Sequence, residues 1–344
     1  MPEIIYRNRR AVRIESGALR VTVLIEGGHI AEILHKPSGV NPLWTPPWPS
    51  IEPSSYSRER HPEYGADAES KLLAGVIGHN LALDSFGSPS PEEAAAGLTV
   101  HGEASVAAWE IEAADGGLIA KAVLPAARLA VERELSFLAD NVVSITETVE
   151  NLAIVDRPVA WAEHVSLGPP FLERGVTEFY VPATRSKTLE ADYEDNYVEP
   201  GVEFDWPFAP RKGGGTADLR VFNGAPVSAA FTTHLMDPAR ERAFFGAHSP
   251  TFGLALLYSW QRTDFPWLGI WEENHARKTP PWNGTTLVRG MEISASPFPE
   301  PRRKMIARNG MFGEPGYRWI PAKSRVSVAY TVFLGNADST PQTA

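Results

Sequence analysis

The sequence of 344 residues contains no cysteine. The chain therefore has no disulfide framework, no thiolate zinc site, no iron–sulfur cluster and no cysteine nucleophile. No run of apolar residues approaches the roughly 18–20 that a membrane-spanning helix requires. The first ten residues also lack the apolar core of a signal peptide, so we expect a cytoplasmic protein without a membrane partner.

Basic charge is also scarce, because 32 Lys and Arg residues stand against 42 Asp and Glu residues and give a formal net charge of −10. An acidic chain without a basic face repels phosphate backbones, so we expect no nucleic-acid partner. The sequence has no phosphate-binding P-loop, no Gly-x-Ser-x-Gly elbow and no His-Glu-x-x-His zinc helix. The common nucleotide-binding, serine hydrolase and zinc protease motifs are thus missing.

Turn-forming residues are frequent: 28 Gly and 30 Pro are spread along the chain. Between them, apolar and polar residues alternate in short runs, which is typical of half-buried strands. These runs predict strands at residues 19–25, 29–34, 104–113, 118–124, 129–137, 142–151, 159–167, 177–181, 227–233, 252–258, 267–271, 286–294 and 325–334. Helical periodicity is weak, and predicts only short helices at residues 91–96, with Ser90 as the cap, and 237–244.

The strands are spaced evenly, with neither an internal repeat nor a linker near the middle of the chain. We therefore predict an all-β fold in which residues 1–344 form one large antiparallel sandwich. Residues 41–69, 83–97 and 184–217 interrupt the strand pattern. Long loops of this kind usually build a binding surface.

Two titratable side chains, His164 and Glu292, stand inside apolar strands, where charged groups are rare unless partnered. Glu163 precedes His164, and adjacent strand residues point to opposite faces, so the two side chains cannot line the same pocket wall. A histidine acid and a carboxylate base on facing strands would suffice for general acid–base catalysis without a metal or other cofactor. The structural alternative is a buried histidine that donates to a backbone carbonyl.

A second polar group, His101-Gly102-Glu103, is expected to begin the strand at residues 104–113. Residues two apart on a strand share a face, so His101 and Glu103 could together bind a metal or a sugar hydroxyl. No His-x-His or carboxylate cluster accompanies them, which disfavours the metal. A histidine at a strand end beside a solvated glutamate is the alternative.

Tryptophan is the third feature, because several indoles lie in or beside the long loops, where a flat ring can pack on the apolar face of a pyranose. The tryptophans concerned are Trp44, Trp48, Trp206, Trp271 and Trp282. For any single one of them, ordinary core packing and loop anchoring is the favoured explanation. In the charged segment after Trp271, Glu273 or Arg277 could reach the same cleft, although surface solvation is the simpler interpretation.

Four segments follow one another in an informative order. The first is Gly27-Gly28-His29-Ile30, between the first two expected strands. The second is Leu98-Thr99-Val100-His101-Gly102-Glu103, followed by Trp109. In the third, Asn151 and Pro158 precede His164 and Phe171, and the fourth is Gly290-Met291-Glu292.

In this order the segments resemble those of the aldose 1-epimerase (galactose mutarotase-like) superfamily over most of the chain. The resemblance implies a β-supersandwich with few short helices and a cofactor-free cleft that holds a small-molecule sugar. By the same resemblance, His164 would protonate the ring oxygen of the sugar. Glu292 would take the proton from the anomeric hydroxyl, and His101 would bind or orient the sugar.

The chain departs from the family pattern at several positions. Where the family often has two arginines, this chain has Gly75-Val76-Ile77-Gly78-His79-Asn80-Leu81, so His79 and Asn80 are expected to bind hydroxyls instead. Asp218 resembles a family aspartate that binds sugar hydroxyls. The residue before His164 is Glu163 and not Asn, and Ile293 replaces a proline. These changes indicate a modified or larger sugar than galactose or glucose.

Two other functions fit the same cleft. One is a carbohydrate sensor or binding protein without catalysis, which the missing arginines and the aromatic loops favour. The other is a lyase or hydrolase reaction on an acidic or oligomeric sugar. The charge of −10 mildly disfavours acidic substrates, although local charge decides binding.

Overall fold

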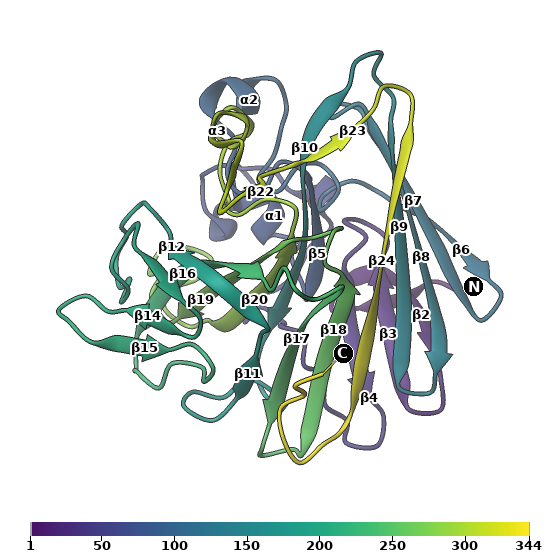
Figure 1. Cartoon of the computed structure of the whole chain (residues 1–344). Coiled ribbons are helices and arrows are strands. Elements are labelled where there is room, and N and C mark those ends of the chain that lie inside the picture. The colour runs from purple at the N-terminus through teal and green to yellow at the C-terminus, as the bar shows by residue number, and fades with distance from the viewer. Residues whose placement is uncertain (1, 344) are drawn as a thin grey trace.

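Two large antiparallel sheets dominate the computed structural model, which describes residues 2–343. The first has the order β1-β2-β3-β4-β5-β10-β20-β19-β16-β12-β13, and β23 pairs with β10 beside this path (Figure 1). Its strands are β1 (Ile4–Tyr6), β2 (Arg9–Glu15), β3 (Leu19–Leu24), β4 (Ile30–His35), β5 (His79–Asp84), β10 (Arg157–Leu167), β12 (Ala183–Thr188), β13 (Glu203–Asp205), β16 (Ser228–Met236), β19 (Trp267–Asn274), β20 (Leu287–Ser294) and β23 (Arg318–Ile320).

The second sheet has the order β11-β17-β18-β24-β9-β8-β7-β6. Its strands are β6 (Glu110–Ala114), β7 (Gly117–Leu124), β8 (Leu129–Ala139), β9 (Val142–Asn151), β11 (Glu178–Tyr180), β17 (Arg242–Ser249), β18 (Leu254–Gln261) and β24 (Arg325–Asn336). Two hairpins complete the strands, β14 (Phe208–Pro210) with β15 (Thr216–Asp218) and β21 (Gly310–Met311) with β22 (Glu314–Pro315).

The helices are short: α1 (Ser70–Leu73), α2 (Pro91–Ala95), α3 (Arg302–Arg308) and the 3-10 turns Pro53–Ser55 and Pro62–Tyr64. In Figure 1 all three α-helices gather above one end of the first sheet. Among residues 2–343, none of these helices is long and apolar enough to cross a membrane.

The main hydrophobic core lies between the two sheets. Strand β9 shows how the sequence builds it, because its burial alternates strictly and every second side chain faces the core. Strand β10 is different, since residues from Val159 to Leu167 are all buried. One face of β10 packs in the core through Trp161 and Val165, and its other face lies under the loops and helix α3 through Ala160 and Ala162.

The predicted all-β antiparallel fold is confirmed, and most of the expected strands agree with observed strands to within a few residues. The helix predicted after Ser90 is also confirmed. The Ser90 side chain accepts from the Glu93 N–H, and the Glu93 carboxylate accepts from the Ser90 N–H, which together form a capping box.

Two local predictions are wrong. Residues 104–107 form turns, Ala108 makes only an isolated bridge, and the strand begins at Glu110, because His101 and Gly102 adopt φ values of 60° and 78° that break an extended chain. The 237–244 segment is not a helix, since β17 starts at Arg242 and buries its phenylalanines against β18. In addition, residues 184–217, expected as a loop, contain all of β13 and β14 and most of β12 and β15.

Candidate active site

Strand β10 lies in the middle of the first sheet and places His164 between two neighbours. His164 is directly opposite Asn80 on β5 and directly opposite Glu292 on β20. Residues paired in this way share a face of the sheet. The three side chains therefore form one row, on the face turned away from the second sheet.

Within this row, His164 Nε2 lies 3.0 Å from Glu292 Oε1. His164 Nδ1 lies 3.1 Å from the hydroxyl of Ser166, which is two residues further along the same face. The other Glu292 oxygen, Oε2, and the Asn80 Oδ1 atom are buried without a hydrogen-bond partner among the described residues. Such unpaired buried acceptors are rare and costly, and here they line a cavity in which a ligand can satisfy them.

Two glycines make room for the pair. A Cβ atom at Gly290 would lie 3.1 Å from Glu292 Oε1 and 3.3 Å from His164 Cε1. A Cβ atom at Gly269 would lie 3.0 Å from Glu292 Oε2. The two glycines thus leave the space around the Glu292 carboxylate free of other side chains.

His101 approaches the pair from the loop after α2. Its ring meets the His164 ring edge to face, with centroids 5.2 Å apart. His101 Nδ1 accepts a hydrogen bond from the Gly87 N–H at 3.2 Å. Desolvation lowers the pKa of His101 to about 3, so the ring is neutral at ordinary pH and carries its proton on Nε2. His101 is therefore a hydrogen-bond donor toward the cavity.

The cavity in front of these residues has a volume of about 490 Å³. Its polar residues are Asn80, His101, His164, Ser166 and Glu292 around the pair, and Glu69, Ser88, Ser90 and Arg277 from the loops. Its apolar side consists mainly of Trp44, Leu72, Leu73, Val76, Val100, Phe231, Trp271 and Trp282. Trp271 joins the two sides, because its ring lies 5.8 Å from the ring of His164 and 5.9 Å from that of Trp282.

Arg277 closes one edge of the cavity. Its guanidinium lies 4.7 Å from the ring centroid of Trp282 and forms a 3.1 Å ion pair with Glu69. Glu273 does not line the cavity. Its buried carboxylate instead accepts the N–H groups of Ala276 and Arg277 at 2.7 and 2.9 Å, which shapes the turn that carries Arg277.

His79 also lies outside the cavity, and the expectation that His79 and Asn80 bind hydroxyls together needs correction. Adjacent residues of β5 point to opposite faces, so Asn80 lines the cavity whereas His79 is fully buried in the core. There His79 Nε2 donates to Glu163 Oε2 at 2.9 Å. Burial lowers the pKa of His79 well below its usual value, so the ring is neutral.

Glu163 belongs to a buried polar network on that core face, as the alternation along β10 predicts. Arg133 donates to Glu147 at 2.5 Å and to Glu163 at 3.3 Å, and the Tyr330 hydroxyl donates to both carboxylates. Burial and, to a lesser extent, the neighbouring Glu163 raise the pKa of Glu147 to about 8 against the lowering effect of Arg133. Arg133 thus binds the carboxyl groups of both Glu147 and Glu163 on the core face of β10, opposite the face that carries His164.

Three other expected residues lie away from the cavity. Asp218 stands at the end of β15, in a hairpin at the left edge of Figure 1, where it is exposed and pairs with Arg220 at 2.7 Å. Trp206 packs on His234 with ring centroids 5.0 Å apart. Glu103 does not share a face with His101, because residues 101–107 form turns and its carboxylate accepts the Ala127 N–H at 2.7 Å.

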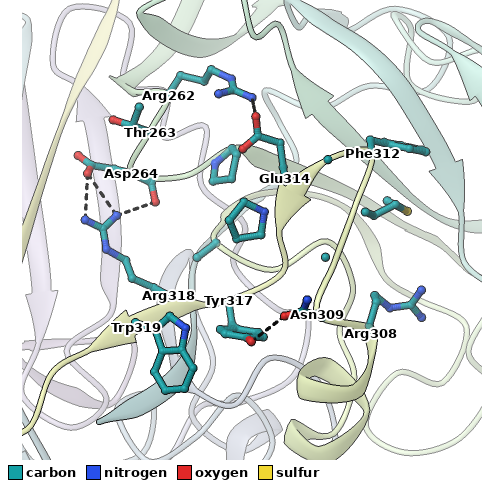
Figure 2. A pocket seen from close by; sticks show the side chains of 16 residues that line it. Arg262, Thr263, Asp264, Arg308, Asn309, Phe312, Glu314, Tyr317, Arg318 and Trp319 are labelled. Atoms are coloured by element: carbon teal, nitrogen blue, oxygen red, sulfur yellow. Dashed lines mark hydrogen bonds and ion pairs between the residues drawn. The ribbon is translucent and has the colours of Figure 1, made fainter.

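A larger hollow of about 890 Å³ lies beside α3 and is shown in Figure 2. Its rim carries arginines that are already paired, Arg262 with Glu314 and Arg318 with Asp264. Trp319 projects at the edge and is 55% exposed. This hollow contains neither His164 nor Glu292, so its size does not make it the reaction site.

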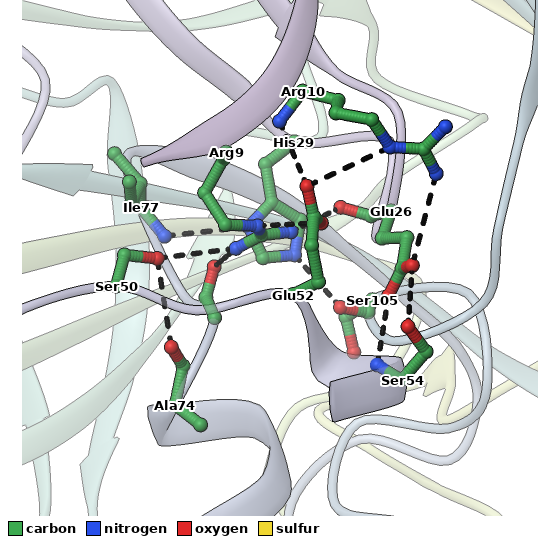
Figure 3. Close-up of polar contacts among 11 residues, drawn as sticks. Arg9, Arg10, Glu26, His29, Ser50, Glu52, Ser54, Ala74, Ile77 and Ser105 are labelled. Atoms are coloured by element: carbon green, nitrogen blue, oxygen red, sulfur yellow. Dashed lines mark hydrogen bonds and ion pairs between the residues drawn. The ribbon is translucent and has the colours of Figure 1, made fainter. Parts of the chain in front are cut away.

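The loops that form the apolar side are fixed to the first sheet by buried polar groups (Figure 3). The guanidinium of Arg9 is fully buried and donates to Glu52 at 2.8 Å and to the carbonyls of Gly75 and Glu26 at 2.6 and 2.7 Å. His29 bridges the Ser105 carbonyl and the Ile77 N–H. Because burial lowers its pKa to about 3, His29 makes both contacts as a neutral ring.

Residues 2–343 contain no group of three or more His, Asp or Glu side chains arranged to hold a metal ion. The polar side of the cavity is instead suited to hydroxyl groups. It offers a histidine donor from the loop after α2, and an amide, a seryl hydroxyl and a carboxylate from one face of the first sheet.

The sequence matches no protein-family model and no curated protein sequence. Solved structures are nevertheless similar along nearly the whole chain. A Klebsiella pneumoniae protein, provisionally named an aldose 1-epimerase, superposes with a TM-score of 0.70 and 16% identity, covering 96% of this chain and 80% of that one. A galactose mutarotase-like protein from Clostridium acetobutylicum superposes with a TM-score of 0.62 and 13% identity over 97% and 98% of the two chains.

The chain has the galactose mutarotase-like fold. A third such structure, a galactose mutarotase-like protein from Lactobacillus casei, gives a TM-score of 0.58 at 14% identity over 94% of this chain and 100% of that one. Identities this low establish the fold and leave the reaction to be argued from the site. Within this mutarotase-like fold, the predicted pair of His164 and Glu292 lies side by side in a cavity.

Several residues of the cavity were not predicted. Ser166 is two positions after His164 and shares its face, so strand periodicity alone was sufficient to indicate it. Gly269 and Gly290 are recognisable only once the register of β19 and β20 is known. Leu72, Leu73 and Val76 come from a segment around α1 whose position depends on contacts far along the chain.

Proposed function

We propose that the protein is a sugar 1-epimerase that interconverts the anomers of an aldose. One observation carries the proposal: His164 and Glu292 face the same cavity from adjacent strands, in contact with each other, and the second oxygen of Glu292 has no partner. An acid and a base in reach of one substrate are what ring opening requires.

In the proposed reaction the pair begins as an imidazolium and a carboxylate. Glu292 Oε2 takes the proton from the C1 hydroxyl while His164 Nε2 gives its proton to the ring oxygen. The bond between C1 and the ring oxygen breaks, and C1 becomes an aldehyde carbon. Rotation about the C1–C2 bond, followed by the reverse proton transfers, closes the ring as the other anomer, so no net proton is consumed.

The remaining polar groups position the sugar. Ser166 holds the Nδ1 side of His164. Asn80 offers an unpaired amide oxygen, and His101 offers its Nε2–H, so together they accept from and donate to sugar hydroxyls. Trp271 supplies an apolar ring beside His164 on which the C–H face of a pyranose can pack.

The test is the rate of anomer conversion on a panel of freshly dissolved aldoses, followed by polarimetry and corrected for the uncatalysed rate. The wild type is expected to accelerate conversion of at least one sugar, and Asp218→Asn, altered outside the cavity, is expected to match it. Binding of sugars by calorimetry with no acceleration of any of them would contradict the proposal and identify the cavity as a binding site.

A further inference from the structure

One part of the cavity wall is polar and another is apolar. Asn80, His164, Ser166 and Glu292 lie on strands β5, β10 and β20, His101 lies beside His164, and the loops add Glu69, Ser88, Ser90 and Arg277. The apolar residues Phe231 and Trp271 lie on strands β16 and β19, and the others that line the apolar part come from the loops and from α1. This division is informative because a simple sugar presents hydroxyl groups around its whole edge.

The apolar part is one continuous hydrophobic cluster. Trp44, Leu72, Leu73, Val76, Val100 and Trp282 line the cavity and also belong to a single buried cluster that Trp271 completes. Trp44 and Trp282 stack with their planes 9° apart. No hydrogen-bonding side chain from this cluster faces the cavity except through the indole edges, so hydroxyls placed here would lose their water without replacement.

The volume of the cavity leaves room for a second chemical group beside the sugar ring. A cavity of about 490 Å³ falls in the range of roughly 300–1,000 Å³ that holds drug-sized ligands. A single hexose against His164, Glu292 and Asn80 leaves the part beside Leu72, Val76 and Val100 for another moiety. Burying apolar surface there contributes binding free energy in proportion to its area.

The charge at the mouth argues against an anionic group as that moiety. Arg277 is the cation of the cavity wall, and it is already paired with Glu69 at 3.1 Å and lies 3.7 Å from Glu273. Its guanidinium also covers the faces of Trp271 and Trp282. The guanidinium of Arg277 therefore covers the two indoles, and its charge is balanced by Glu69 and Glu273.

We propose that the substrate is a sugar with a free C1 hydroxyl that carries an apolar substituent, such as an acyl group, at another ring position. The sugar ring lies on the polar row, and the substituent enters the space between Trp44, Val76, Val100 and Trp282. This inference rests on the proposed function for the free C1 hydroxyl, whereas the preference for an apolar group rests on the cavity wall alone.

The experiment measures binding of D-glucose, D-galactose and their mono-O-butanoyl esters at C2, C3, C4 and C6 by titration calorimetry. At least one ester is expected to bind ten or more times tighter than its parent, since each methylene that leaves water contributes roughly threefold to fourfold in affinity. If no ester binds tighter than its parent sugar, the inference is wrong.

Two isosteric variants test where in the cavity the apolar substituent binds. Val76→Thr adds a hydroxyl to the cavity wall and is expected to remove most of the affinity advantage of the ester over its parent sugar. Val106→Thr is the matched control, because Val106 belongs to the same buried cluster, at 8% against 7% exposure, but does not line the cavity. An equal loss of the affinity advantage of the ester in both variants would contradict the placement of the apolar substituent beside Val76.

Anomer conversion of the same compounds separates the two proposals. Tight ester binding without conversion of any compound would end the epimerase assignment and leave the apolar subsite standing. Conversion of parent sugars as fast as of every ester, with equal binding, would uphold the epimerase and overturn the apolar subsite.

Discussion

His164 and Glu292 stand directly opposite each other on β10 and β20, with Nε2 and Oε1 3.0 Å apart. The register of one strand pair thus fixes the separation of the proposed acid and base. Shifting either strand by one residue would turn one of the two groups into the core.

The space around this pair yields the first prediction. Gly290→Ala places a methyl group 3.1 Å from Glu292 Oε1 and 3.2 Å from Trp271, so the carboxylate and the imidazole must move apart. We expect anomer conversion to fall by roughly tenfold to a hundredfold, because small misplacements of catalytic groups are costly. Gly224→Ala, where the nearest atom is 3.7 Å away, is the control and should retain the wild-type rate. Full activity in Gly290→Ala would show that the contact is not needed.

His101 yields a prediction about substrate binding. Since its pKa is about 3, the ring stays neutral from pH 5 to pH 8 and its contribution should not change across that range. His101→Phe is expected to raise KM about tenfold, equivalent to one lost hydrogen bond, by the same factor at pH 5.5 and pH 8. His101→Gln, which keeps a donor, should recover part of the loss. An effect seen only at the lower pH would mean that His101 binds as a cation.

The buried Arg9 yields a prediction about stability. Arg9→Met removes the donor to Glu52 and to the carbonyls of Gly75 and Glu26, leaving buried acceptors without a partner. The free energy of unfolding in urea should fall by about 2–4 kcal/mol. Arg10→Met, at a side chain that is 48% exposed, should change it by less than about 0.5 kcal/mol. Similar values for the two variants would refute the anchoring role of Arg9.

Glu147 yields a prediction about pH. Its pKa is raised from 4.5 to about 8 in the folded protein, so between these values the folded state holds a proton that the unfolded state has lost. Stability must then decrease as the pH rises from about 5 to 8, by up to about 1.4 kcal/mol per pH unit from this group. Glu147→Gln should show a flatter profile over the same range. An unchanged slope in this variant would assign the titration to another group.

The alternation of apolar and polar residues was sufficient to predict the all-β fold and the two faces of β10. It placed Glu163 and His164 on opposite faces, and in the structure Glu163 lies in the core and His164 in the cavity. It failed for β2 and β5, whose polar and charged residues interrupt the alternation. Strand β5 contains the adjacent polar residues His79 and Asn80, and β2 begins with Arg9, so neither shows the simple pattern.

The site was harder to predict than the fold because its walls come from distant segments. His164 and Glu292 were paired as titratable groups inside two apolar strands and by the order of the family segments, but neighbouring residues such as His79 and Asn80 could not both face the cavity. Asp218 resembled a sugar ligand by sequence, yet its hairpin lies away from the cavity and binds Arg220. The apolar wall depends on Arg9 holding the turn after α1 through the Gly75 carbonyl, which is a contact between residues 66 positions apart.

The central claim is that Glu292 and His164 exchange protons with an aldose, and magnetisation-transfer NMR between its anomers measures this directly. For the sugar that the wild type converts fastest, Glu292→Gln and His164→Gln should each lower the enzyme-dependent exchange rate by about 10²–10⁴-fold, with folding confirmed by circular dichroism. Exchange at the wild-type rate in either folded variant would contradict the account.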